Sequence, residues 1–240
     1  MAIAWTELTQ GADTINNPAT TEEITPTSGA VAYAAVIVAE TGVDTPPVGG
    51  SLAISGAGLT WTEMTSESHG GRRRIWVFRG TGTPSTGALT ITYTPTVGAF
   101  AEMMWSIDEA TGVDSGDPDD APVTNSTAGA SALAMGDVGT PGTDDHIYAA
   151  FSIEGATVSA TVDDGTALTN LGGGSDCRTI VAFYDADHSD ETPSIAWTGT
   201  ESAAGIGFIV NAAAAGGRTT KNTRAYPLGV EVGMNWRGAL

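Results

Sequence analysis

Two short acidic segments hold the residues best suited to chemistry in this sequence. One places four carboxylates within seven residues, and the other places carboxylates at alternating positions: Asp114, Asp117, Asp119 and Asp120; Asp185 and Asp187. Hard cations such as Ca²⁺ prefer oxygen ligands from loops of this kind. The first segment lacks EF-hand spacing, and a solvated acidic loop is the alternative interpretation of both. We therefore expect no cofactor other than Ca²⁺, with these six residues as its candidate ligands.

Other arrangements that could support catalysis are not favoured by their spacing. Zinc at His188 would need His69 or His146, and neither lies at ligand spacing from it. Glu102 and Glu109 would have to be held about 5–10 Å apart for glycoside hydrolysis, a separation that only the fold can set. The sequence contains no Gly-x-Ser-x-Gly elbow for a nucleophilic serine. We therefore predict no catalytic residues and no enzyme activity.

A basic cluster interrupts the acidic chain at Arg72, Arg73 and Arg74. One interpretation is the start of a strand whose arginines pair with nearby carboxylates. The other is a contact with an acidic partner surface, such as a neighbouring subunit. On the second interpretation, Arg72 and Arg73 are candidate interface residues.

The six tryptophans fall into groups by position. Trp61, Trp76 and Trp105 lie within apolar runs and are expected in the core. Trp5 and Trp236 lie near the two ends of the chain, where a large aromatic side chain is well suited to anchoring in another polypeptide. We therefore expect Trp5 and Trp236 at an interface.

The charge balance limits the partners of this protein. Lys and Arg number 9 against 28 Asp and Glu, which gives a net charge of −19. Phosphates would be repelled, so nucleic acid is not an expected partner. No apolar run reaches the ~20 residues of a membrane-spanning helix, and residues 1–5 do not resemble a secretory signal, so no membrane partner is expected. Cys177 is the single cysteine, which excludes an intramolecular disulfide.

Short runs rich in β-branched and aromatic residues fill most of the sequence. They have the usual length of strands, clusters of turn-forming residues separate them, and no stretch of about ten residues has a helical period. The runs are 31–38, 59–64, 74–79, 88–93, 101–107, 146–151, 179–184, 194–197 and 206–210. This pattern predicts an all-β protein built as a sandwich or a barrel, and of the two we expect an antiparallel β-sandwich.

Two of these runs predict different surroundings. In the run 88–93, the apolar residues Leu89, Ile91 and Tyr93 alternate with threonines, so one face of this strand is expected to meet solvent. The run Val31–Val38 is apolar on both faces. Such a strand must be covered twice, once by the partner sheet and once by a neighbouring subunit or an intrachain loop.

The C-terminal segment 218–240 differs from the rest of the chain in charge and in pattern. It carries four basic residues and one acidic residue, and its apolar residues alternate with period two between positions 228 and 234. A segment with this alternation can add as a strand to its own sheet or to another chain. We predict a single domain over residues 1–217 and an assembly arm over 218–240, with these candidate interface residues: Arg224, Tyr226, Trp236 and Arg237.

Four stretches carry a resemblance to a known family. Residues 58–64 contain a Gly-x-Thr-Trp strand, residues 70–80 contain a second tryptophan, residues 87–91 are a further strand, and residues 104–114 run into Glu-Ala-Thr-Gly-Val. Together they resemble a jelly-roll domain that recurs in virion proteins of tailed phages and in bacterial surface proteins. The resemblance covers roughly residues 25–212 and implies a jelly-roll, concanavalin-like topology. Its motifs are structural, so it supports the fold more than a function.

The resemblance implies a structural protein of a virus particle, located in the virion as a capsid decoration or turret subunit. Such a subunit acts by assembly, both with itself as a homo-oligomer, a trimer being the expected ring, and with the major capsid protein or another virion protein. A tail or fibre subunit is an alternative in the same particle. The alternative outside this setting is a calcium-assisted carbohydrate-binding or adhesion module.

Overall fold

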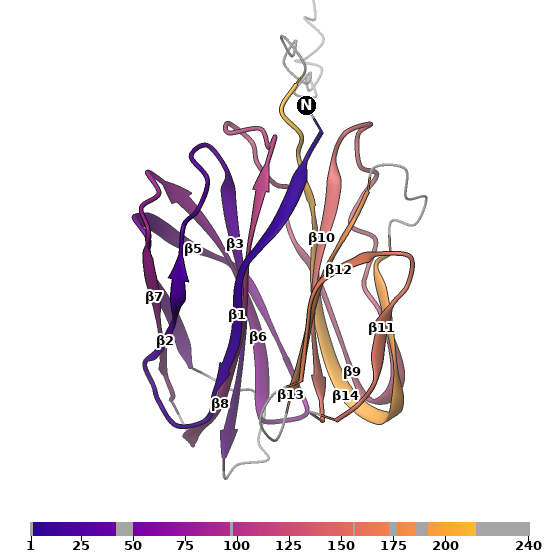
Figure 1. Ribbon diagram of the computed structural model, residues 1–240. Coiled ribbons are helices and arrows are strands. Elements are labelled where there is room, and N and C mark those ends of the chain that lie inside the picture. The colour runs from indigo at the N-terminus through magenta and orange to yellow at the C-terminus, as the bar shows by residue number, and fades with distance from the viewer. Residues whose placement is uncertain are drawn as a thin grey trace, which may run out of the picture.

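The computed structural model describes residues 2–41, 50–96, 98–155, 157–172, 177–185 and 192–214. In these residues the chain forms fourteen β-strands, arranged as two antiparallel sheets that pack face to face (Figure 1). The prediction of an all-β protein with two antiparallel sheets is therefore confirmed. None of the described residues belongs to a helix that is long and apolar enough to cross a membrane.

The first eight strands along the chain make the first sheet. Its order is β1 (Ala4–Asp13), β8 (Ala99–Thr111), β3 (Val31–Thr41), β6 (Arg73–Gly82), β5 (Leu59–His69), β4 (Ser51–Gly56), β7 (Gly87–Thr94) and β2 (Ala19–Ile24). This sheet curls until it is nearly barrel-shaped, so that its two edge strands, β1 and β2, come close to each other.

The last six strands make the second sheet. Its order is β11 (Ala160–Val162), β14 (Ser194–Val210), β10 (His146–Glu154), β13 (Cys177–Tyr184) and β12 (Thr166–Gly172), and β9 (Val123–Ala134) also pairs with β14. Each sheet is thus built from one continuous half of the chain. The strand order does not confirm the jelly-roll topology, which stays a prediction.

The apolar side chains form three cores rather than one. The first fills the interior of the curled first sheet and includes Trp76, Phe78 and Trp105. The second lies between the two sheets and includes Tyr33, Val77, Tyr148 and Phe208. The third lies on the other face of the second sheet and includes Phe151, Tyr184, Ile195 and Trp197.

Strand β3 shows why two of these cores adjoin the first sheet. Its even-numbered residues, such as Val36, point into the curled sheet, while odd-numbered residues such as Ile37 face the second sheet. Each fully buried side chain of this size contributes about 1.5–3 kcal/mol. The prediction that Val31–Val38 is covered twice is confirmed. The second cover is neither a subunit nor a loop but the curled remainder of the same sheet.

Candidate functional site

Both ends of the described chain lie at one end of the molecule, which we call the terminal pole (Figure 1). Gly112, which directly follows β8, lies against both of them. The backbone N–H of Ala213 donates a hydrogen bond of 2.6 Å to the carbonyl oxygen of Gly112. On its other side, a Cβ atom added to Gly112 would lie 2.4 Å from the carbonyl oxygen of Ala2, and the residue has a φ of +78°. Only glycine fits this position without strain.

Aromatic rings form a stack at the terminal pole. The ring centre of Trp5 lies 5.4 Å from that of Tyr148 and 5.9 Å from that of Phe183. The ring centre of His146 lies 5.7 Å from that of Phe183. The indole Nε1–H of Trp5 donates a 3.1 Å hydrogen bond to Nδ1 of His146. This bond places the proton of a neutral His146 on Nε2.

The protonation of His146 is set by burial. Burial lowers the pKa of the imidazole below its usual value, although the carboxylates of Asp185, Asp145 and Asp144 act in the opposite direction. The ring is therefore neutral at physiological pH. It does not cancel the negative charge of the carboxylates around it.

A pocket of about 390 Å³ opens beside this aromatic stack. Its lining comes from the N-terminal segment, from the loop before β10 and from the end of β13: Ala2, Ile3, Ala4, Trp5, Thr143, Asp144, His146, Phe183 and Asp185. A second pocket of about 220 Å³ shares Thr143 and Asp144 with it and extends to residues 212–214. We call the two pockets together the pole groove.

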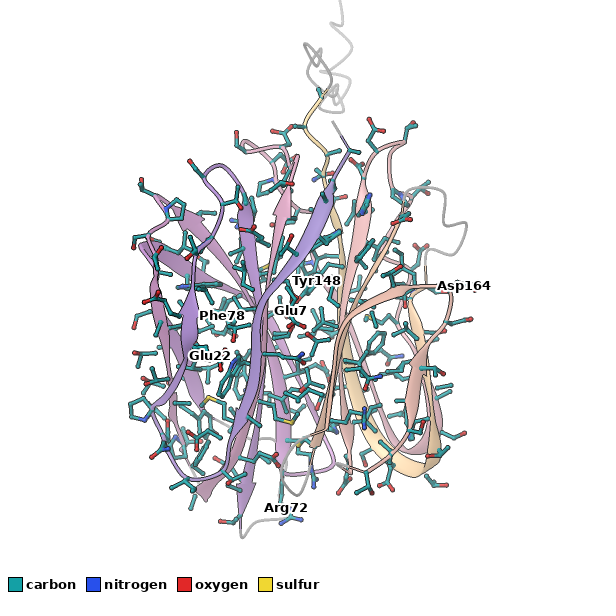
Figure 2. The ribbon with its side chains drawn as sticks, in the orientation of Figure 1. Glu7, Glu22, Arg72, Phe78, Tyr148 and Asp164 are labelled. Carbon is teal, nitrogen blue, oxygen red and sulfur yellow. The ribbon has the colours of Figure 1, made fainter. Side chains whose placement is uncertain are left out.

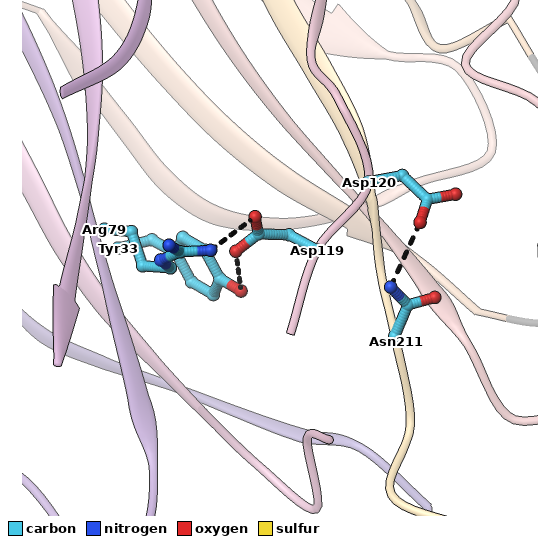
Figure 3. Close-up of polar contacts among 5 residues, drawn as sticks. All are labelled: Tyr33, Arg79, Asp119, Asp120 and Asn211. Atoms are coloured by element: carbon cyan, nitrogen blue, oxygen red, sulfur yellow. Dashed lines mark hydrogen bonds and ion pairs between the residues drawn. The ribbon is translucent and has the colours of Figure 1, made fainter. Parts of the chain in front are cut away.

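The acidic segment 114–120 is bonded at both ends to the chain at and after the end of β14, while its middle residues 115–117 are exposed. The Asp114 N–H donates to the carbonyl oxygen of Asn211 at 2.8 Å, and the Asp120 N–H donates to the carbonyl oxygen of Ile209 at 2.9 Å. The side-chain amide of Asn211 donates to the carboxylate of Asp120 at 3.1 Å (Figure 3). The carboxylate of Asp114 accepts from the N–H of Gly116 at 2.9 Å.

Asp119 joins this segment to the first sheet. Its carboxylate accepts a 2.8 Å hydrogen bond from the guanidinium of Arg79 on β6 and a 3.3 Å hydrogen bond from the hydroxyl of Tyr33 on β3 (Figure 3). Burial raises the pKa of Asp119, against the opposite effect of Arg79 and Tyr33. The carboxylate therefore has a structural role, which the sequence could not reveal because Arg79 and Tyr33 are distant in the chain.

The predicted calcium ligands are not brought together in the part of the chain that the structure describes. Within those residues, no three His, Cys, Asp or Glu side chains are placed to hold a metal ion. Asp185 lines the pole groove with 68% of its side chain exposed, and Asp187 lies outside the described residues. Calcium binding stays a prediction.

The basic cluster lies at the opposite end of the molecule, where Figure 2 labels Arg72. Arg73 is buried and forms a 2.8 Å ion pair with Glu154 of β10. The guanidinium of Arg74 lies 5.5 Å from the ring centre of Trp76, a cation–π distance. These contacts favour the interpretation that arginines at the start of β6 pair within the chain. Arg72 is half-buried.

The remaining interface candidates lie near the chain ends. Trp5 is half-buried against its own chain, so the ring that was expected to anchor another polypeptide supports the aromatic stack. The other four lie outside the described residues: Arg224, Tyr226, Trp236 and Arg237.

A fully buried carboxylate between the two sheets was not anticipated from the sequence. Oδ2 of Asp108 lies 2.9 Å from the hydroxyl of Ser106 and 3.2 Å from that of Tyr148. The Ser106 hydroxyl is 2.6 Å from that of Thr169, which lies 2.9 Å from the carboxylate of Glu7. Figure 2 shows Glu7 and Tyr148 in the layer between the sheets.

The number of hydrogens available to this chain of contacts indicates that one of its carboxyl groups is protonated. The three contacts that run from Asp108 through Ser106 and Thr169 to Glu7 each need one hydrogen, but the two hydroxyls supply only two. The third must come from a proton on one of the two carboxyl groups at the ends, Asp108 or Glu7. Burial independently raises the pKa of Asp108 to about 7. The raised pKa assigns the proton to Asp108 below neutral pH. The sequence signal for this site is a carboxylate within the buried part of β8, which also contains Glu102 and Glu109.

A buried Ser–His pair also connects the sheets. Nε2 of His69, at the end of β5, lies 2.7 Å from the hydroxyl of Ser152 on β10. Burial and, to a smaller extent, Arg73 lower the pKa of His69 to about 3, so the imidazole is neutral. The Ser152 side chain is 0% exposed. In this setting the pair holds two strands together and does not present a nucleophile to solvent.

Comparisons of the chain with protein-family models, with curated proteins and with solved structures give no match. The established result is an all-β protein with two antiparallel sheets. Membership of the jelly-roll family is a prediction from the residues alone.

Proposed function

We propose that this protein is a structural subunit of a virus particle, a jelly-roll capsid decoration or turret subunit that acts by assembly. The observation that carries the proposal is the convergence of Ala2 and Ala213 on Gly112 at the terminal pole. The chain enters and leaves the body at the same end. A subunit attached there by both of its terminal segments would project its opposite end away from the particle.

The charge distribution supports this orientation. The C-terminal segment 218–240 is basic, whereas the rest of the chain is strongly acidic. A basic arm suits attachment to an acidic neighbour, such as a sister subunit, the major capsid protein or another virion protein. The projecting acidic surface would keep particles dispersed through mutual repulsion. A tail or fibre subunit would use the same attachment at another place in the particle.

Assembly can be tested on the purified protein by measuring its mass with light scattering over a range of protein and salt concentrations. The full chain is expected to form a homo-oligomer, with a trimer as the first candidate, and a chain ending at Gly217 is expected to be monomeric with an unchanged melting temperature. If both chains are monomers under all conditions, self-assembly through the arm is excluded.

A second candidate function rests on the pole groove. Its aromatic rings, the Nε2–H of a neutral His146 and the exposed carboxylate of Asp185 are the kinds of group that bind sugars by stacking and hydrogen bonding. In this case the protein is a carbohydrate-binding or adhesion module. A glycan array with and without a calcium chelator tests it, because specific binding that the Trp5→Ala substitution removes would favour this function over a purely structural one.

A further inference from the structure

We infer that the pole groove is a docking surface for the basic segment 218–224 of the same chain. The inference rests on the groove, on the charges around it and on where the chain leaves the described body. It does not depend on the proposed assembly role, because it concerns the isolated protein.

Among the residues that the structure describes, no Lys or Arg forms an ion pair with the exposed carboxylates of the groove. Asp144 and Asp185 line the larger pocket and are exposed, and His146, whose Nδ1 lies 3.9 Å from the carboxylate of Asp185, is neutral. Asp145 differs, since its carboxylate accepts the backbone N–H groups of Gly142 and Ala212, both at 2.8 Å. The exposed pair is therefore suited to a cationic partner, and Asp145 holds the floor of the second pocket in place.

Aromatic rings give the groove a second feature that suits cations. Trp5 and Phe183 line the same pocket as the two exposed carboxylates. Guanidinium and ammonium groups bind favourably over aromatic faces, and this attraction adds to that of a carboxylate. Lysine or arginine side chains satisfy both features, whereas an anionic ligand would be repelled.

The sequence supplies such a partner close by. Residues 218–224 contain Arg218, Lys221 and Arg224 and no acidic residue. The described body ends at Ala214, which itself lines the second pocket of the groove. Arg218 follows four residues later, and four residues span at most about 14 Å. Covalent attachment over so short a distance gives an effective concentration on the order of millimolar.

The chain offers an unusually clean probe of this contact, because Lys221 is its only lysine. A carbodiimide, which joins an amine directly to a carboxylate, is applied to the full-length protein, and the joined peptides are identified by mass spectrometry. We expect Lys221 to be linked to Asp144 or Asp185. Links spread evenly over remote carboxylates such as Glu22 and Asp164 (Figure 2) would overturn the inference.

Mixing ¹⁵N-labelled and unlabelled protein decides which copy supplies the segment. Links within one isotope are expected, and links between isotopes would show docking on a second copy and would overturn the intramolecular arrangement. Oligomers in light scattering bear on the assembly role alone, so the two proposals can fail separately.

A second measurement uses trypsin cleavage after Arg218, Lys221 and Arg224 in the full-length protein. Asp144→Asn with Asp185→Asn is expected to raise the cleavage rate at low salt at least about threefold, the change expected from the loss of two exposed ion pairs. The matched control is Glu22→Gln with Asp164→Asn, which removes two exposed carboxylates away from the pole and should leave the rate unchanged. Equal rates in wild type and both variants would contradict docking.

Discussion

The layer between the two sheets and the terminal pole use carboxylates in opposite ways. Between the sheets, Asp108 is buried with hydroxyl partners and Asp119 is held by Arg79 and Tyr33. At the pole, Asp144 and Asp185 face solvent along a groove. The acid-dense segment 114–120 contributes Asp119 to the first kind, whereas its Asp117 is exposed. In an acidic protein, the density of carboxylates in the sequence therefore does not locate a binding site, because the fold can supply each carboxylate with an internal partner.

The largest expected effect concerns Asp108. Its pKa is about 7 in the folded protein, against an ordinary value of 3.8, so the folded state holds a proton that the unfolded state releases between these values. This group's contribution to stability is complete below pH ~4 and is lost as the pH rises towards 7. Asp108→Asn, whose amide can donate as the protonated acid does, is expected to be more stable than wild type at pH 8 by about 2–4 kcal/mol.

Urea unfolding at several pH values measures this effect. The difference between Asp108→Asn and wild type should shrink as the pH falls from 8 to 4, because the acid itself is protonated at low pH. A difference that does not change with pH would show that Asp108 is already ionised in the fold, which would contradict the assignment of the proton to this residue.

The next effect comes from Arg79, whose loss leaves the carboxylate of Asp119 with the Tyr33 hydroxyl as its one side-chain partner among the described residues. The Asp119 side chain is 7% exposed and that of Arg79 is 30% exposed, so the pair is only partly screened by water. Arg79→Met is expected to cost about 2–3 kcal/mol of unfolding free energy, less than for a fully buried pair. Adding Asp119→Asn should recover part of the loss, and full additivity of the two changes would mean that the two residues do not interact.

Gly112→Ala tests the connection at the pole. The new Cβ would meet the Ala2 carbonyl at a positive φ, and we expect a loss of about 1–3 kcal/mol in thermal or urea unfolding. Gly29→Ala is a matched control, because Gly29 has a similar φ of +82° but open space around it. Equal losses in the two variants would assign the whole effect to the backbone and none to contact with the N-terminal segment.

The smallest effect is expected at the exposed carboxylates of the pole. Asp144→Asn with Asp185→Asn should change the free energy of unfolding by less than about 0.5 kcal/mol, as for most surface substitutions. Chemical denaturation at pH 7 measures it. A loss above about 1 kcal/mol would remove the contrast between the pole and the layer between the sheets, since it would show that these side chains have structural partners.

Much of the strand content could be predicted because apolar patterning is a local property. All nine predicted runs lie within strands of the structure, although 194–197 and 206–210 are parts of the single strand β14. The missed strands are rich in small and polar residues. Strand β9, for example, is mostly exposed and is defined by its pairing with β14 rather than by its own side chains.

By itself, the sequence determined the all-β class, the double burial of β3 and the contrast in charge between the body and residues 218–240, because these depend on residue type and period. Only the tertiary structure decided which carboxylates are partnered. Asp119 meets Arg79 and Tyr33 across 40 and 86 residues of chain, and Asp108 meets Tyr148 across 40. The curling of the first sheet and its packing on the second bring these groups together, and spacing along the chain carries no record of either.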